Sequence, residues 1–554
     1  MLEASRGLLR NPWAQRVILV AVIVWTFWDG IWAGIARADQ IPYLHQVGQF
    51  DSLWDIVSHS FAWNRTRPPV QDVLLYRPGS YLLLGTLYYV FRYNFIEWQI
   101  ASLCAHLIVV LGLHLLLLRG GLRHTVFPLL IGLLFGTAFL SSEQVLWNHI
   151  VGYLLFCGLA VYATYFLVLY LQTDHRAFLA LAVVLGMLAE FTYEFGVLLN
   201  LLFAASLLPK RASPATIEPV ERARVASVWM PLTFAVSAAL LPIISLIDLR
   251  ARGLALPWSG RASVDWNSAS LAAAYCLHQI GRWTMVWLLP TAYPIYAAGR
   301  AFCTSFIFSF STVSVVNVVS VAWLAMAGLL ALRSALRGRS WHRRALFALV
   351  PPLVFLLGYS LVIAVGRALP RGLGFVIHEN VYYSYVAYLT IAVAIALASL
   401  AWRPSASNQL ASLDADRHFA AQADFAEAGT SPDVGLRFAL ALFGLTLVNA
   451  YSSAALAHDF RYHFAAATQQ TIDRVAAWQK RIGSDADRYF LVSATCPGSE
   501  PLHWFGEAYL RKGSGWHPPV SLADALWPNR SARLNAAKTH AGSDVDEIRC
   551  DGNL

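Results

Sequence analysis

The sequence is short of charge, because only 13% of its 554 residues are Asp, Glu, Lys or Arg, whereas 57% are hydrophobic. A single water-soluble core cannot absorb that much apolar surface. The apolar residues form continuous runs and do not alternate with polar ones, which favours membrane-spanning helices. The composition therefore excludes an ordinary soluble enzyme and predicts an integral membrane protein.

Two well-known phosphate-binding patterns are also absent. The loops contain no P-loop and no Gly-rich dinucleotide fingerprint, so cytoplasmic nucleotide chemistry is not expected. The net charge of +9 comes from 41 basic and 32 acidic residues. These charges are spread over the connections between apolar runs, so they indicate orientation by the positive-inside rule rather than nucleic-acid binding.

The apolar runs set the predicted fold class. A bilayer core about 30 Å thick needs about 20 apolar residues per helix. Full crossings are predicted at 17–36, 98–118, 125–140, 150–171, 177–190, 195–208, 228–248, 310–332, 345–366, 381–401 and 436–456. The shorter or proline-broken segments 78–91 and 283–298 are predicted to be re-entrant or paired half-spans. We expect an all-α multi-span membrane protein of about 11 to 13 transmembrane helices.

The basic clusters predict the topology. With this threading every one of them is cytoplasmic, as is the N-terminus, in what we expect to be a bacterial inner membrane: Arg6/Arg10/Arg16, Arg119/Arg123, Arg176, Lys210/Arg211/Arg222/Arg224, Arg333/Arg337/Arg339/Arg343/Arg344 and Arg403. Ala36, Arg37 and Ala38 also resemble the end of a secretory signal, which would leave Asp39 as a new N-terminus. The length of the first run and its tryptophans favour a retained anchor.

Composition also predicts the domains. Residues 1–401 form the membrane domain, 402–435 a flexible cytoplasmic linker rich in Ser, Ala and Asp, 436–456 the last transmembrane helix, and 457–554 an extracytoplasmic domain. This last domain is expected to be a small α/β fold, with a helix at 464–482 and a strand in YFLVSA. Its two cysteines, Cys496 and Cys550, predict a disulfide in an oxidising compartment.

Several polar residues lie on the predicted outer side. Asp39 follows the first crossing closely, where partial desolvation raises the proton affinity of a carboxylate and suits it to general base catalysis; a helix cap is the alternative. Asp51 and Asp55 lie one turn apart in a stretch that predicts an amphipathic helix on the interface. Arg77, before a proline, either clamps a phosphate through its planar fork or snorkels towards headgroups.

Three later segments add candidates. SSEQVLWNHIVGY holds Glu143 and His149 in one short outer loop. AEFTYEFG places Glu190 and Glu194 four residues apart at membrane depth, where ionisable residues are functional candidates by default. The last outer loop carries Arg367, Arg371, His378 and Glu379. These cations suit an anionic lipid-linked ligand or, alternatively, anchor the loop to headgroups.

Taken in order, these motifs resemble the GT-C superfamily of membrane glycosyltransferases, and most closely its protein O-mannosyltransferase-like branch. The motifs are an acid after the first span, YRP, a long span with a histidine (ASLCAHLIVVLGLHLLLL), a loop with Glu, Asn and His before Gly, and a Glu-containing corner followed by Gly. The resemblance covers about residues 17 to 210, with an echo at 366 to 385. It implies a polyprenyl-phosphate sugar as donor and a protein or glycan as acceptor.

The resemblance also implies roles for residues. Asp39 matches the acid that acts on the acceptor, Arg77 the entrance of the next helix, Glu143 and His149 the second polar loop, and Glu194 with Gly196 the later corner. Related enzymes often carry two adjacent acids where this chain has Ala38 and Asp39, so use of a divalent metal stays open. NVYYSY lacks the family's Arg-Tyr pair, so the phosphate contact is expected at Arg367 or Arg371.

Three functions remain in competition. The first is transfer of a sugar from a polyprenyl-phosphate donor to an acceptor hydroxyl on the extracytoplasmic face. The second is a polysaccharide polymerase or ligase of cell-envelope assembly that would not depend on Asp39. The third is a non-catalytic protein or a transporter, although a transporter predicts internal inverted repeats that the sequence does not show. Convergence of Asp39, Arg77 and Glu194 on one outward-facing site would favour the first.

Overall fold

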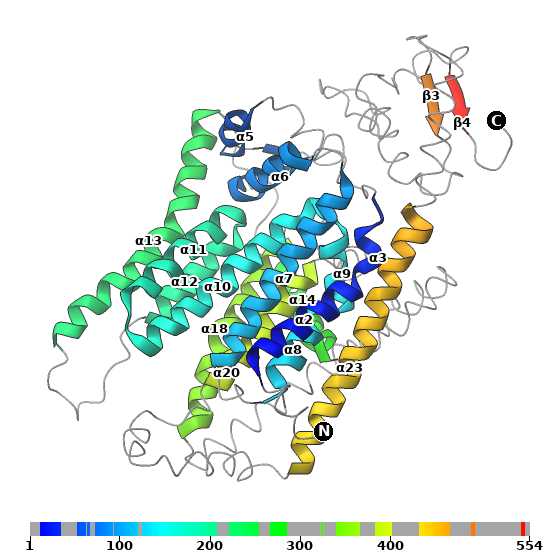
Figure 1. Ribbon diagram of the computed structural model, residues 1–554. Helices are drawn as coiled ribbons and strands as arrows, with labels where there is room; N and C mark the ends of the chain where they lie inside the picture. The colour runs from blue at the N-terminus through cyan, green and yellow to red at the C-terminus, as the bar shows by residue number, and fades with distance from the viewer. Residues whose placement is uncertain are drawn as a thin grey trace.

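The computed structural model describes most of the helical part of the chain. The described residues are 11–34, 52–61, 64–66, 73–91, 94–119, 125–207, 221–253, 266–284, 322, 325, 340–365, 383–400, 432–465, 489–492 and 545–548. Helices dominate them and gather into one bundle (Figure 1). The strands are two short pairs, β1 (Asn64–Thr66) antiparallel to β2 (Val73–Leu75), and β3 (Tyr489–Val492) parallel to β4 (Val545–Ile548).

The helices follow the apolar runs of the sequence. Their bounds are α2 (Pro12–Thr26), α3 (Trp28–Ile31), α5 (Leu53–Ser60), α6 (Pro78–Phe91), α7 (Phe95–Arg119), α8 (Phe127–Gly136), α9 (Phe139–Leu146), the 3₁₀ turn η1 (Asn148–Ile150), α10 (Val151–Thr173), α11 (Arg176–Thr192), α12 (Phe195–Leu207), α13 (Glu221–Ala251), α14 (Trp266–Thr284), α18 (Ser340–Ile363), α20 (Ser384–Leu400), α23 (Pro432–Asp459) and the π-helical turn η6 (Phe460–Ala465).

The protein is a membrane protein. Four helical stretches among the described residues are long and apolar enough to cross a bilayer: Phe95–Arg119, Val151–Thr173, Pro231–Ala251 and Ala439–Tyr462. Each overlaps a predicted crossing. Shorter apolar helices coincide with most of the others, whereas segments 283–298 and 310–332 lie essentially outside the described residues. The full number of crossings and their direction therefore stay predictions.

A shared apolar core joins these helices. α10 packs against α7 and α11, α12 against α13, and α18 against both α14 and α20. Large buried side chains such as Trp98, Phe156 and Tyr388 fill the spaces between them. In a membrane, where lipid offers the same apolar surroundings as a neighbouring helix, close packing and interhelical hydrogen bonds hold such a bundle together.

One helix was missed by the sequence reasoning. The region 249–309 was assigned to the outer surface, apart from a half-span beginning at 283, but α14 occupies Trp266–Thr284 and buries Tyr275 and Cys276 in the core. The mean hydropathy of this helix is too low for it to be recognised as a membrane crossing, because Asn267, His278 and Gln279 interrupt its apolar positions. Packing against α18 and α20 is what places it in the bundle.

The C-terminal predictions are tested only in part. β3 coincides with the strand predicted in YFLVSA. α23 begins at Pro432, slightly earlier than the predicted last crossing. Cys496, Cys550 and nearly all of the predicted 464–482 helix lie outside the described residues, as does the linker up to 431. The α/β domain and its disulfide therefore remain predictions.

Candidate functional site

The first element of the candidate site is the entrance to α6. β2 ends at Leu75, and Pro78 begins the helix, a position where its missing N–H and fixed φ are favourable. The backbone carbonyl of Arg77 accepts the first helical hydrogen bond, from Tyr81 N at 3.1 Å. The YRP sequence therefore fixes Arg77 directly at the helix start, with its side chain free to leave the helix axis.

The second element is the sharp corner between α11 and α12. The chain leaves α11 at Tyr193, which has an extended backbone, and re-enters a helix at Phe195. Gly196 N donates to Tyr193 O at 2.9 Å. A Cβ on Gly196 would collide with the backbone of Glu190, so only glycine permits this approach. The corner thereby projects Glu194 from the end of the bundle.

Small residues hold the two elements together. Ser80 Oγ donates to the backbone carbonyl of Thr192 at 2.8 Å. Gly79 faces the backbone of Phe191 and Thr192, where an added Cβ would lie 3.1 Å from the Phe191 oxygen. The helix start and the corner are thus in backbone contact, although more than a hundred residues separate them.

At this contact Arg77 and Glu194 form a bidentate ion pair. Arg77 Nε donates to Glu194 Oε2 at 2.8 Å, and Nη2 donates to Oε1 at 2.6 Å. The Arg77 side chain is 16% exposed and that of Glu194 is 41% exposed. Parallel N–H···O bonds of this kind fix the orientation of the guanidinium as well as its position. We call this pair, with the tyrosine beneath it, the Arg77–Glu194 corner.

Two tyrosines complete the corner. The guanidinium carbon of Arg77 lies 4.4 Å from the ring centre of Tyr193, a cation–π distance. The Tyr153 ring lies 4.2 Å from that of Tyr193 and 6.3 Å from that of Tyr383. Burial acts to lower the pKa of Arg77, but the charge of Glu194, the hydrogen bonds that it accepts from Arg77 and the neighbouring Tyr193 and Tyr153 together raise that pKa well above its usual value. Arg77 is therefore a permanent, oriented cation.

This geometry sharpens one sequence hypothesis. Arg77 was expected either to clamp a phosphate or to snorkel towards headgroups; it instead pairs with a second predicted site residue. Among the described residues only Nε and Nη2 of Arg77 have hydrogen-bond acceptors. Nη1 keeps two N–H groups that a phosphate or sugar oxygen can accept. Glu194 balances the positive charge of Arg77, but the Nη1 hydrogen-bond donors of Arg77 still have no acceptor among the described residues.

The second polar segment is helical and not the short loop that the sequence predicted. Residues 139–150 form α9 and η1, and Ser141, Ser142, Gln144 and Asn148 are completely buried. Gln99 of α7 donates to the carbonyl of Leu146 at 3.0 Å. The prediction of a loop was wrong because neighbouring helices supply partners for these polar side chains, so the segment folds as helix inside the bundle. Glu143 and His149 belong to α9 and η1, but their side chains lie outside the described set.

The last helix holds α9 in place. Ser142 Oγ donates to Ser453 Oγ at 3.0 Å, and Ser453 Oγ donates to the carbonyl of Thr137 at 2.8 Å. The backbone N–H of Phe139 donates to Asn449 Oδ1 at 3.2 Å. We call this set of contacts the α9–α23 seam. It joins a helix near the start of the chain to one some three hundred residues later.

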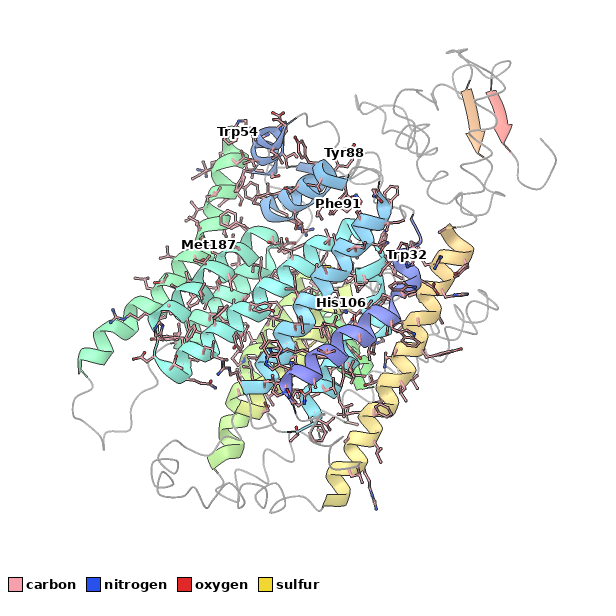
Figure 2. All side chains as sticks on the ribbon, in the orientation of Figure 1. Trp32, Trp54, Tyr88, Phe91, His106 and Met187 are labelled. Atoms are coloured by element: carbon pink, nitrogen blue, oxygen red, sulfur yellow. The ribbon has the colours of Figure 1, made fainter. Side chains whose placement is uncertain are left out.

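The histidines of the long span are structural. His106 Nε2 lies 2.8 Å from the carbonyl of Gly136, and its Nδ1 lies 2.8 Å from Tyr385 Oη. A carbonyl can only accept, so Nε2 carries the proton and Nδ1 accepts from the tyrosine. Figure 2 shows His106 within the bundle, on α7. His114 likewise bonds Gln15 Oε1 at 2.8 Å. Both side chains therefore link helices; His106 uses both ring nitrogens, whereas Nδ1 of His114 is buried without a hydrogen-bond partner among the described residues.

Glu190, the other acid of the AEFTYEFG segment, is also structural. It is fully buried, and its carboxylate accepts from Asn200 Nδ2 at 2.7 Å and from Leu241 N at 3.2 Å. The backbone donor belongs to α13, next to Pro242, which stands inside that helix. Glu190 thus satisfies a backbone donor beside this proline, whereas Glu194 is partly exposed at the corner.

The remaining predicted site residues are not placed by the structure. Asp39, Arg367, Arg371 and His378 lie outside the described residues. Within the described part of the chain, no group of three or more His, Cys, Asp or Glu side chains could hold a metal ion. The structure therefore brings together two of the eight predicted site residues, Arg77 and Glu194.

Sequence reasoning missed the tyrosines of the site. Tyr153 follows the polar segment directly, Tyr193 precedes Glu194, and Tyr383 belongs to NVYYSY. Tyr359 of α18 donates its hydroxyl to the carbonyl of Tyr383 at 2.6 Å, which extends the cluster into the second half of the bundle. Their presence in each quoted motif was a signal, but in a chain with 23 tyrosines it was not selective.

Comparison of the chain with protein-family models, with characterised proteins and with solved structures gives no match. The function is therefore argued from the site alone.

Proposed function

We propose that the protein is a membrane glycosyltransferase that moves a sugar from a polyprenyl-phosphate donor to an acceptor hydroxyl on the extracytoplasmic face of the cell membrane. The observation that carries the proposal is the Arg77–Glu194 corner. It presents an oriented guanidinium on a tyrosine ring, at one end of the helical bundle, with donors that no described residue uses. The phosphate of a lipid-linked sugar lies at the membrane surface, where the helices of such a bundle end.

The proposed reaction needs a base and a cation on opposite sides of the sugar. Asp39 removes the proton from the acceptor hydroxyl as its oxygen attacks the anomeric carbon, and the bond to the phosphate oxygen breaks. Arg77, with Arg367, Arg371 and His378, stabilises the departing phosphate. Glu194 orients Arg77 and partly neutralises its positive charge. The anionic phosphate product is therefore bound weakly enough to leave the site. Glu143 and His149 contact the sugar or acceptor, and the chemistry itself requires no cofactor.

The test is turnover of donor lipid by the full-length protein in vesicles, with a panel of polyprenyl-phosphate sugars. Arg77→Lys keeps the charge but loses the bidentate geometry, so turnover should fall about tenfold or more, on the scale of one oriented hydrogen bond to a charged group. Arg119→Lys is the matched control, because Arg119 also bonds and overlies a tyrosine, Tyr165. Equal losses in the two variants, or no donor turned over by the parental protein, would contradict the proposal.

The base assignment is tested separately. Asp39→Asn replaces a carboxylate by an amide of similar size, so the fold should persist while turnover falls by about 10²–10⁴, the usual contribution of a positioned general base. Donor binding should change far less, because it rests on the arginines. Parental turnover by Asp39→Asn, together with loss of assembly in Arg367→Ala, would favour the polymerase or ligase function.

A further inference from the structure

The short helix α5 presents three different faces. Ser52 caps it by accepting from Asp55 N at 3.1 Å. With about 100° between successive residues, its side chains divide around the axis. Ile56 and Ser60 share the first face; Leu53, Val57, Phe61 and Trp54 follow on the second; Ser58, Asp55 and His59 occupy the third.

Two contacts fix α5 to the candidate site, one from its first face and one from Phe61 at its end. Ile56 is 1% exposed and packs on Gly85 of α6, where its side chain fills the space that a Cβ would need. The ring of Phe61 lies 6.3 Å from that of Phe191, at the end of α11. α6 begins next to Arg77, and α11 ends just before Glu194. α5 is therefore attached to both elements that build the Arg77–Glu194 corner.

The second face is apolar and uncovered. Trp54 is 74% exposed, Leu53 50% and Phe61 44%. Adjacent apolar side chains of this size are not normally left in water. Figure 2 shows Trp54 on α5 at the same end of the bundle as Phe91 of α6.

The third face is polar and lies roughly opposite the apolar one. Asp55 accepts from Ser52 Oγ at 2.7 Å, and His59 Nδ1 lies 2.7 Å from the carbonyl of Asp55. Ser58 and His59 are exposed. An apolar face with an aromatic residue, opposed by a polar face, is typical of a helix lying in a membrane interface.

The apolar face continues the lipid-facing surface of the bundle. The C-terminal half of α13 exposes Ile243, Leu246 and Ile247 within a stretch that is long and apolar enough to cross the bilayer. α13 packs against α11, and α11 in turn packs against α6 and contacts Phe61 of α5 through Phe191. Lipid that covers α13 thus reaches the level of α6 and the helix attached to it.

We propose that α5 lies in the surface of the membrane, with Leu53, Trp54 and Phe61 among the lipid chains and Asp55 and His59 towards water. Through α6 it sets the depth of the Arg77–Glu194 corner relative to the lipid headgroups. The inference rests on the faces of α5 and not on the proposed glycosyltransferase activity. Its partner is the bilayer and not a second protein.

The test uses nitroxide labels on the full-length protein in phospholipid vesicles. Trp54→Cys and Leu53→Cys report the apolar face, and Ser58→Cys reports the polar face of the same helix. All three positions are exposed, so labelling disturbs little packing. The parental protein, labelled in parallel, corrects for native cysteines, and its unfolding temperature confirms the fold of each variant. Collisions with oxygen, which concentrates in lipid, are compared with those of a water-soluble nickel complex.

The ratio of oxygen to nickel collisions should be several-fold higher at positions 53 and 54 than at 58. Because the purified protein has no other partner in the vesicles, equal and water-like ratios at all three positions would overturn the proposal and leave the apolar face to a protein partner. A lipid-like ratio at position 58 would also overturn it, because α5 would then be embedded rather than lying at the surface.

Discussion

The Arg77–Glu194 corner and the α9–α23 seam are both polar contacts between distant parts of the chain, but they differ in charge and exposure. The seam consists of neutral groups that are buried and bonded to one another. The corner consists of a cation and a carboxylate, and Glu194 is 41% exposed. Neutral, sealed bonds specify how helices dock, whereas a charge pair open on one side can exchange partners with a ligand. This contrast is why we assign function to the corner and assembly to the seam.

The largest change in stability is expected when the corner loses its carboxylate. Glu194→Leu leaves Arg77, which is 16% exposed, without its counter-charge, and should lower the free energy of unfolding by about 3 kcal/mol. The measurement is unfolding of the detergent-solubilised protein. Arg252→Leu is the control, because its pair with Asp248 is exposed and should be worth less than about 0.5 kcal/mol. Equal effects would mean that Arg77 is solvated and the corner open.

A second change acts on the backbone of the corner. Gly196→Ala places a methyl group against the backbone of Glu190 and should cost about 2 kcal/mol through overpacking. Gly444→Ala in α23 is the control, since nothing lies within 4 Å of its added Cβ, and it should be neutral or stabilising by about 0.5–1 kcal/mol. Thermal unfolding distinguishes them. Identical shifts would show that α11 and α12 do not meet as closely as the corner requires.

The smallest change concerns the seam. Ser453→Ala removes a hydroxyl that accepts from Ser142 and donates to Thr137 O, and should cost about 0.6–1.7 kcal/mol, the range for interhelical bonds in membranes. The neighbouring Ser452→Ala is the control, because among the described residues that hydroxyl bonds within its own helix, to Val448 O. Under the contrast drawn above, Ser453→Ala should leave donor turnover unchanged. Loss of turnover without loss of stability would move the function to the seam.

The sequence predicted well where hydropathy decides structure. The crossing at 98–118 lies within α7, the crossing at 150–171 matches α10 to within two residues, and the short segment 78–91 is α6 to the residue. The sequence-based prediction failed for α14, which is too polar to be recognised by hydropathy, and for α9, which is a helix where a loop was expected. In both cases the deciding factor was the set of partners that neighbouring helices provide, which lies far away in the sequence.

For the candidate site, too, local sequence determined some features and the packing of distant helices determined others. The sequence alone determined that Arg77 stands before a helix-starting proline and that Glu194 stands at a corner with glycine two residues later, because proline and glycine restrict the backbone locally. Only the tertiary structure decided that these two side chains form one ion pair over Tyr193, and that Glu190 instead accepts hydrogen bonds from Asn200 and from the backbone of Leu241. Local sequence sets where a side chain leaves the backbone, whereas the packing of distant helices sets which charge it meets.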